Sequence, residues 1–125
     1  MLELGDLGLA GGGVLADARI SYRVHGELGD GRPAVLLPHM YSGTHASMDF
    51  LVGPGRALDP ERLAIVCPGQ LGNGVSTSPS TTGLRDGAFP ALAIADDVAA
   101  QACLLDRLGI ARVELALGYS MGAQQ

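Results

Sequence analysis

The chain contains no lysine and no tryptophan, and only five of its 125 residues are aromatic. A Walker phosphate loop requires its lysine, so the lack of lysine excludes the P-loop nucleotide-binding proteins. Eight arginines stand against thirteen acidic residues, which gives a formal net charge of −5. Because the chain has neither a basic stripe nor an aromatic platform on which bases could stack, we expect no nucleic acid among its partners.

Cysteine and metal-ligand patterns are also scarce. The two cysteines, Cys67 and Cys103, form no C-x-x-C motif, and one pair is too few for a disulfide framework. Both lie in apolar segments, where cysteine behaves as a small core residue. The nearest approach to a metal motif combines His39, His45 and Asp49, whose spacing matches no strong metal-binding pattern. We therefore expect no metal site.

Long apolar runs are absent, since none approaches the roughly 18 residues that a membrane span requires. The first six residues lack the basic region and the continuous apolar region of a signal peptide. These absences predict a cytoplasmic protein with no membrane partner. A length of 125 residues suits a single domain with a core of its own.

Four segments read as strands. Residues 2–9 and 14–25 partly alternate between apolar and polar side chains and are separated by glycines at 11–13, which predicts an antiparallel hairpin. The runs 34–37 and 63–67 are apolar without alternation. Such runs are typical of strands that are buried on both faces of a parallel sheet.

The segment 91–108 predicts a helix. Six apolar residues recur at helical spacing and form the expected buried stripe: Ile94, Val98, Ala102, Leu104, Leu105 and Leu108. Asp96 and Asp97 lie in the first turn, where negative charge favours the helix dipole, and Gly109 is a typical stop. A last apolar strand follows at 113–117. The order of elements predicts an α/β fold with a partly parallel sheet.

A serine motif follows this last strand directly. The pattern Gly118-x-Ser120-x-Gly122 matches a nucleophile elbow, in which a strand turns sharply into a helix and exposes the serine at the bend. The two glycines leave room for the turn, and the N–H of Met121 points to where an oxyanion would develop. An ordinary strand-to-helix turn without a nucleophile is the alternative that the motif leaves open.

Several further segments resemble the homoserine O-acetyltransferase-like branch of the α/β-hydrolases, in that branch's order and over almost the whole chain. They are Ala-Val-Leu-Leu-Pro-His-Met-Tyr-Ser-Gly at 34–43, Leu-Gly-Asn-Gly-Val-Ser-Thr-Ser-Pro-Ser at 71–80, matching positions between 89 and 110, and Ser-Met-Gly at 120–122. The resemblance implies the N-terminal half of an α/β-hydrolase fold. That half has a mostly parallel sheet, an antiparallel N-terminal hairpin and flanking helices.

The sequence departs from the branch at the elbow and also at Ala93, Ala95 and Ser78, where the branch often has Thr, Arg and Gly. Acetyltransferases of the branch usually carry Gly-Gly-Ser-Met-Gly-Gly, whereas Tyr119 precedes the serine here and Ala123 replaces the last glycine. The sequence looks more like the hydrolase-type relatives, which implies hydrolysis of a small carboxylic ester through an acyl-enzyme and no cofactor. The alternative is a homoserine O-acetyltransferase that uses acetyl-CoA as co-substrate.

The resemblance also assigns roles in the loop after the second apolar run. The backbone N–H of Tyr41 is the implied second oxyanion donor, with Met40 as the nearby alternative. His39 is interpreted as a hydrogen-bonded residue that orients this loop rather than as a proton shuttle. Tyr119 either shapes the acyl pocket or simply packs, and His25 is expected to be structural or solvated.

The catalytic partners of the serine are missing from the chain. In α/β-hydrolases the triad acid and histidine follow the serine, and only five residues follow Ser120. We expect residues 1–125 to be one partial domain, truncated just after the elbow and inactive alone. The other readings are a non-catalytic binding protein or inactive fragment of this fold and, last, a nucleotide-binding α/β domain, since no Gly-x-Gly-x-x-Gly follows a strand. The expected partner is a small ester or acyl donor, and a homodimer is left open.

Overall fold

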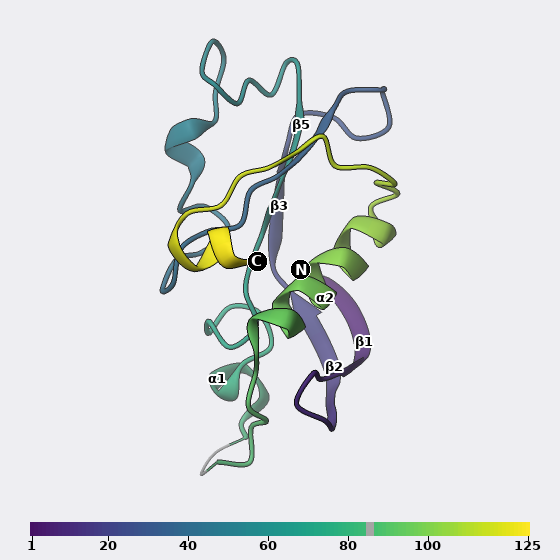
Figure 1. The fold of residues 1–125 in the computed structure, drawn as a ribbon, viewed down its shortest axis with the longest axis vertical. Helices are drawn as coiled ribbons and strands as arrows, with labels where there is room; N and C mark the ends of the chain where they lie inside the picture. Colours follow the sequence, from purple (N-terminus) through teal and green to yellow (C-terminus); the bar gives the residue numbers. More distant parts are fainter. Residues whose placement is uncertain (85–86) are drawn as a thin grey trace.

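The computed structural model describes residues 1–84 and 87–125, which form two sheets and a long helix (Figure 1). The strands are β1 (Leu2–Gly8), β2 (Val14–Ile20), β3 (Tyr22–His25), β4 (Ala34–Leu36), β5 (Ala64–Pro68) and β6 (Leu115–Ala116). The helices are α1 (Pro79–Thr82) and α2 (Ile94–Arg107), with short 3₁₀ helices η1 (Asp49–Leu51) and η2 (Ser120–Gln124). None of the helices in the described residues is both long and apolar enough to cross a membrane.

The larger sheet has the strand order β3-β5-β4-β6, with β4 parallel to both of its neighbours and β3 antiparallel to β5. All five residues of β5 are buried, as the continuous apolar run predicts for a strand covered on both faces. The sheet therefore confirms the expected mostly parallel arrangement. The carboxyl ends of β4, β5 and β6 lie at the same edge, and the loops that leave this edge meet there.

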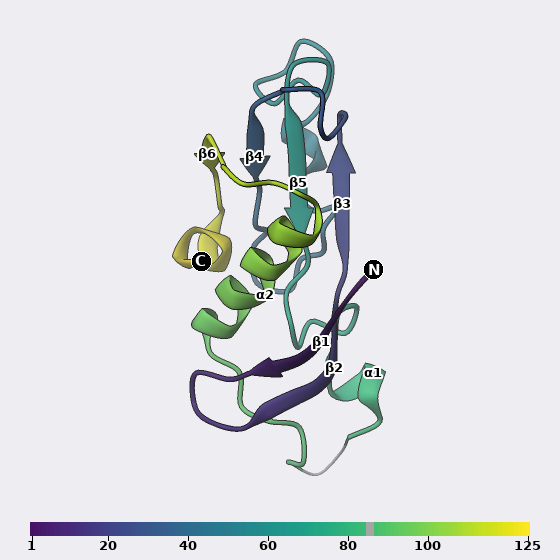
Figure 2. The ribbon, with the colours of Figure 1, turned by 90° about the vertical axis from the view of Figure 1, so that its right-hand side faces the viewer.

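The predicted second strand of the hairpin is interrupted at Ser21. Residues before this break pair with β1, and residues after it pair with β5, so the hairpin extends beyond the larger sheet (Figure 2). Ser21 is buried; its N–H donates to Ser76 Oγ (3.0 Å), and its carbonyl accepts the N–H of Gly69 (2.6 Å). The N–H of Ser21 thus bonds to a side chain, and its carbonyl already bonds on the β5 side, so the strand changes partner at this residue and one predicted strand becomes two.

The predicted buried face of α2 is right at its C-terminal end, where Leu104 is buried and Leu105 and Leu108 pack against the core, and wrong at its N-terminal end. Ile94 and Val98 are 36% and 40% exposed, whereas the buried face carries Asp96, Asp97, Ala100, Gln101 and Leu104. The polar members of this face are buried because they are hydrogen-bonded. Asp96, for example, accepts the N–H of Ala93 and the N–H of Ala10 in the hairpin turn, both at 2.7 Å.

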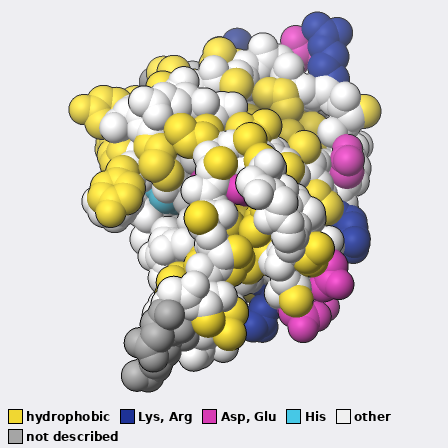
Figure 3. All heavy atoms as spheres, turned by 60° about the horizontal axis from the view of Figure 1, so that its bottom comes forward, with side chains coloured by type: hydrophobic (Ala, Val, Ile, Leu, Met, Phe, Trp, Pro, Cys, Tyr) yellow, Lys and Arg dark blue, Asp and Glu magenta, His cyan; other side chains and the backbone are white. Residues whose placement is uncertain are grey.

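The apolar core lies on both sides of the larger sheet. One cluster joins the hairpin and α2 to the sheet, through residues such as Ile20, Val66 and Leu104. The other joins the opposite face to the segment around Met48 and Leu58. Both cysteines are free; Cys67 packs in the second cluster and Cys103 packs against the first, as expected for small core residues. Outside the core, large apolar side chains also remain exposed, and Figure 3 shows apolar side chains in scattered groups over one face of the molecule.

Asp97 gives the fold a testable pH dependence. Its carboxylate accepts the N–H of Leu71 (2.7 Å) and is 5% exposed, and burial raises its pKa to about 6. The folded state therefore holds a proton that the unfolded state releases near pH 4, so stability falls as pH rises from about 4 to about 6 and is level above that. We expect Asp97→Asn to remove this pH dependence. A difference of two pKa units between the folded and unfolded states corresponds to a fall of about 3 kcal/mol in the free energy of unfolding.

The measurement is urea unfolding of the wild type and Asp97→Asn at pH 4, 5, 6 and 7. Asp106→Asn is the matched control, since Asp106 is an exposed aspartate of the same helix. An equal pH slope in the wild type and Asp97→Asn would contradict the assignment to this carboxyl group.

Candidate active site

Ser120 lies at the turn between β6 and η2 with an exposed side chain. Its φ angle is 54°, in the left-handed region that residues with a Cβ rarely adopt. Ser42, in the loop after β4, also has a positive φ, of 58°. Of the three non-glycine residues with positive φ in the described part of the chain, two thus lie in the loops at this edge of the sheet. Such outliers concentrate at functional sites.

The two elbow glycines are required by close backbone contacts. A Cβ on Gly118 would lie 2.5 Å from the nitrogen of Ala123 and would also collide with the carbonyl oxygen of Gly122. A Cβ on Gly122 would lie 2.6 Å from the carbonyl oxygen of His39 and would collide with that of Pro38. Gly122 therefore lets the elbow pack directly against the start of the loop after β4.

The loop after β4 has a fixed peptide at Met40–Tyr41. The carbonyl of Met40 accepts two hydrogen bonds, from Nδ1 of His39 (2.8 Å) and from the N–H of Gly43 (3.1 Å). In a trans peptide the carbonyl and the following N–H point in opposite directions. The N–H of Tyr41 therefore points away from both donors, and within the described residues it has no hydrogen-bond acceptor.

A cleft of about 280 Å³ lies where the loops after β4 and β5 meet the elbow. It is lined by Tyr41, Ser42, Gln70, Leu71, Gly72, Asn73 and Met121. The N–H of Met121 belongs to the first turn of η2 and has no acceptor within that helix. The cleft therefore brings together the residues whose N–H groups are the predicted oxyanion donors. A larger cavity, of about 460 Å³, lies against the hairpin and includes no residue of the elbow.

His39 is buried, with 1% of its surface exposed. Since the carbonyl of Met40 can only accept, Nδ1 of His39 carries the proton. Burial lowers the pKa of His39, which favours a neutral ring with an unprotonated Nε2 at neutral pH. Nε2 is also buried and has no partner among the described residues. Tyr41 and Tyr119 lie on the surface, 73% and 60% exposed.

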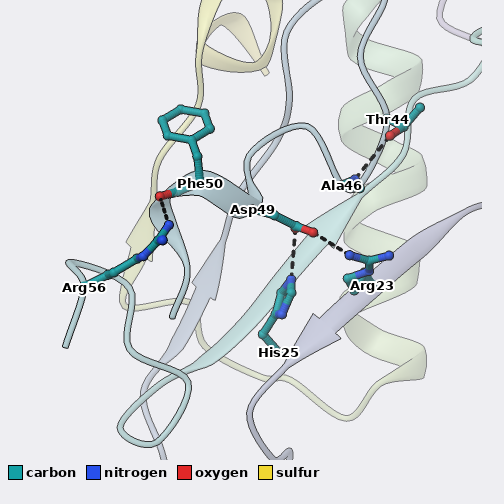
Figure 4. A network of polar contacts seen from close by, with 7 residues as sticks. All are labelled: Arg23, His25, Thr44, Ala46, Asp49, Phe50 and Arg56. Carbon is teal, nitrogen blue, oxygen red and sulfur yellow. Dashed lines mark hydrogen bonds and ion pairs between the residues drawn. The ribbon is translucent and has the colours of Figure 1, made fainter. Parts of the chain in front are cut away.

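Asp49 is the centre of a polar network on the side of the sheet that carries η1 (Figure 4). It forms an ion pair with Arg23 and a hydrogen bond with Nε2 of His25 (3.2 Å). His25, which we expected to be structural or solvated, is half-buried and joins β3 to η1 through this bond. The sequence signal is its spacing, because residues 23 and 25 of a strand share one face.

Among the described residues, this network is also the nearest approach to a metal site. Ligand atoms of His25, Asp49 and Cys67 lie within 4.8 Å of one another, which is a different set from the His39, His45 and Asp49 considered from the sequence. The guanidinium of Arg23 already neutralises Asp49, and burial raises the pKa of the Cys67 thiol to about 12. A protonated thiol and a paired carboxylate are poor metal ligands, so we interpret the network as structural.

Gln70 is a cleft residue that the sequence did not single out. Its side chain is 2% exposed, and Nε2 donates to the carbonyl of His39 at 2.8 Å. The available signal is its position, since it is the first polar side chain after β5 at the carboxyl edge of the sheet.

Comparison with known proteins agrees with this geometry. A family model of the alpha/beta hydrolase fold matches residues 33–125. The ethyl acetate hydrolase of Pseudomonas veronii is 42% identical over 130 residues, which cover 100% of this chain and 37% of that protein. The homoserine O-acetyltransferase of Trichormus variabilis is 38% identical over 127 residues, covering 94% of this chain and 35% of that protein.

Among solved structures, the acetyl esterase MekB superposes with a TM-score of 0.92 at 40% identity, over 99% of this chain and 37% of its own. The chain thus spans little more than a third of the length of these relatives. The resemblance found in the sequence and the predicted fold are both confirmed. The chain belongs to the α/β-hydrolase fold family.

Proposed function

We propose that the protein containing this chain hydrolyses small carboxylic esters through an acyl-enzyme on Ser120. The observation that carries the proposal is the left-handed backbone of Ser120 at the exit of β6, which presents an exposed hydroxyl at a tight elbow. A non-glycine residue held in this conformation costs about 1–3 kcal/mol, which a plain turn could avoid with glycine.

The steps follow from the groups around the cleft. Ser120 Oγ attacks the ester carbonyl carbon, and the oxygen that becomes negative is stabilised by the N–H groups of Met121 and Tyr41, with Met40 as the alternative to Tyr41. The alcohol leaves with a proton, and water then attacks the acyl-enzyme to release the acid and regenerate the serine. We infer that the base for both proton transfers comes from the part of the protein that follows Ser120, where this fold places the triad acid and histidine.

Hydrolysis is favoured over acyl transfer to homoserine by two features. Tyr119 and Ala123 replace the glycines that flank the elbow in most acetyltransferases of the branch. The relative named as an ethyl acetate hydrolase is 42% identical, and the homoserine O-acetyltransferase is 38% identical. Acetyl-CoA is a co-substrate only under the transferase alternative. The proposed reaction needs no cofactor. We also propose that the protein is cytoplasmic, and the proposal is compatible with a homodimer.

The test compares the full product of the native gene with the 125-residue chain. We expect the full product to release acid from ethyl acetate and p-nitrophenyl acetate, with no homoserine-dependent release of CoA from acetyl-CoA. The chain alone is expected to turn over neither ester, because it lacks a base for Ser120. CoA release that requires homoserine would instead establish the transferase, and inactivity of the full product in both assays would favour a non-catalytic protein of this fold.

A further inference from the structure

Gln70 forms a buried hydrogen bond with the loop that carries the proposed oxyanion donor. Its Nε2 donates to the carbonyl of His39 at 2.8 Å, across 31 positions of sequence. Because that carbonyl can only accept, the nitrogen of the amide must face it, and the orientation of the side chain is fixed. Gln70 also lines the cleft together with Tyr41 and Met121. The residue therefore lies between the end of β5, the loop and the elbow.

The bond has no equivalent elsewhere in this loop. In the described structure, the other side-chain hydrogen bonds of residues 38–47 are internal to the segment: those of His39 with Met40, of Ser47 with Thr44, and of Thr44 with Ala46. Gly122 touches the loop only by packing. The amide of Gln70 is thus the side chain that connects the loop to another strand end by a hydrogen bond.

The bond also sets the direction of an N–H. Holding the carbonyl of His39 points the N–H of Met40 the opposite way, since they share one trans peptide. The next peptide is held by the two donors to the Met40 carbonyl. Two successive peptides of the loop are therefore held. Gln70, which follows β5, holds the His39–Met40 peptide, and hydrogen bonds within the loop hold the Met40–Tyr41 peptide.

We propose that Gln70 is a positioning residue that holds the loop after β4 in register with the serine elbow, so that its N–H groups meet the developing oxyanion. The inference rests on the proposed function of Ser120. Oxyanion donors interact more strongly with the transition state than with the substrate, so a displaced loop lowers kcat more than it changes KM. Small displacements of catalytic groups cost up to about 100-fold in rate.

The test uses the full-length protein and two variants at this position. Gln70→Met keeps the length of the side chain but removes the donor, and we expect kcat for p-nitrophenyl acetate to fall roughly 10- to 100-fold with KM within about twofold. A trifluoromethyl ketone that adds to the serine should lose affinity by a similar factor, because its adduct carries the oxyanion. Gln101→Met is the matched control, since Gln101 is 3% exposed and its amide donates to Gln125 and not to a residue of the loop.

Gln70→Glu separates positioning from a structural role. The ionised carboxylate cannot donate to the His39 carbonyl, whereas the protonated acid can. The ratio of Gln70→Glu activity to wild-type activity is therefore expected to rise as pH falls, which loss of packing would not produce. This variant decides the question if Gln70→Met does not fold. A flat ratio, or a Gln70→Met enzyme with wild-type kcat and inhibitor affinity, overturns the proposal.

Hydrogen exchange distinguishes failure of this inference from failure of the proposed function. We expect amides 40–43 to exchange faster in Gln70→Met and unchanged in Gln101→Met. If the wild type hydrolyses no ester, the proposed function fails. Faster exchange of amides 40–43 in Gln70→Met would then still support the conclusion that Gln70 holds the loop. If the wild type is active and exchange in Gln70→Met is unchanged, the positioning role fails alone.

Discussion

Ser120→Ala is expected to lower kcat for ester hydrolysis by about 10⁴- to 10⁶-fold in the full-length protein, the range found when a serine nucleophile is removed. No other group is proposed to form the acyl-enzyme, so the variant loses covalent catalysis and keeps only what the oxyanion donors and binding provide. The measurement is kcat on p-nitrophenyl acetate. Rapid quenching followed by intact-mass analysis should show an acetylated wild type and an unmodified variant.

Two further variants make this result specific. Ser80→Ala changes an exposed serine of α1, outside the cleft, and should leave kcat unchanged. Ser120→Gly should be as inactive as Ser120→Ala. Its free energy of unfolding should exceed that of Ser120→Ala by about 1 kcal/mol, because glycine adopts a φ of 54° without strain. Acetylation of Ser120→Ala, or activity within about tenfold of the wild type, would rule out Ser120 as the nucleophile.

The sequence predicted those parts of the fold that depend on local patterns. The continuous apolar runs at 34–37 and 63–67 become β4 and β5 in parallel register, because only burial on both faces suits such runs. The elbow motif is also local, since Gly118 and Gly122 act within a few residues of Ser120. At that level residue type and spacing suffice.

What the sequence did not predict depends on partners far along the chain. The break at Ser21 requires Ser76, 55 positions later, to accept the backbone N–H of Ser21. The buried face of α2 is partly polar because Asp96 bonds to the hairpin turn and Asp97 to Leu71. A helical pattern of apolar residues cannot reveal such bonds.

The same distinction applies to the site. The sequence singled out Ser120 and, by resemblance, Tyr41, since each belongs to a recognisable segment. It passed over Gln70, whose interest lies in a bond to His39 that exists only when the ends of β4 and β5 are side by side. The network of Asp49 with Arg23 and His25 was missed for the same reason. Short-range patterns therefore give the groups proposed to react, and tertiary contacts give the groups that hold them.

Gly122→Ala is expected to impair both stability and catalysis, since the elbow and the loop after β4 meet at this residue. The new Cβ would collide with the carbonyl oxygens of Pro38 and His39, which are backbone atoms and cannot rotate away. Overpacking of this kind typically costs about 1–3 kcal/mol. We also expect kcat to fall by about 100-fold, because the elbow must shift relative to the oxyanion donors.

The cost at Gly122 is steric alone, since this glycine has no positive φ. Gly11→Ala is therefore the matched control: Gly11 also has no positive φ, and its Cβ would have no atom within 4 Å. It should change the free energy of unfolding by less than about 0.5 kcal/mol. Urea unfolding and kcat, measured together on both variants, give the test. Wild-type values for Gly122→Ala would mean that the elbow and the loop are not in contact, and the oxyanion geometry derived from that contact would have to be abandoned.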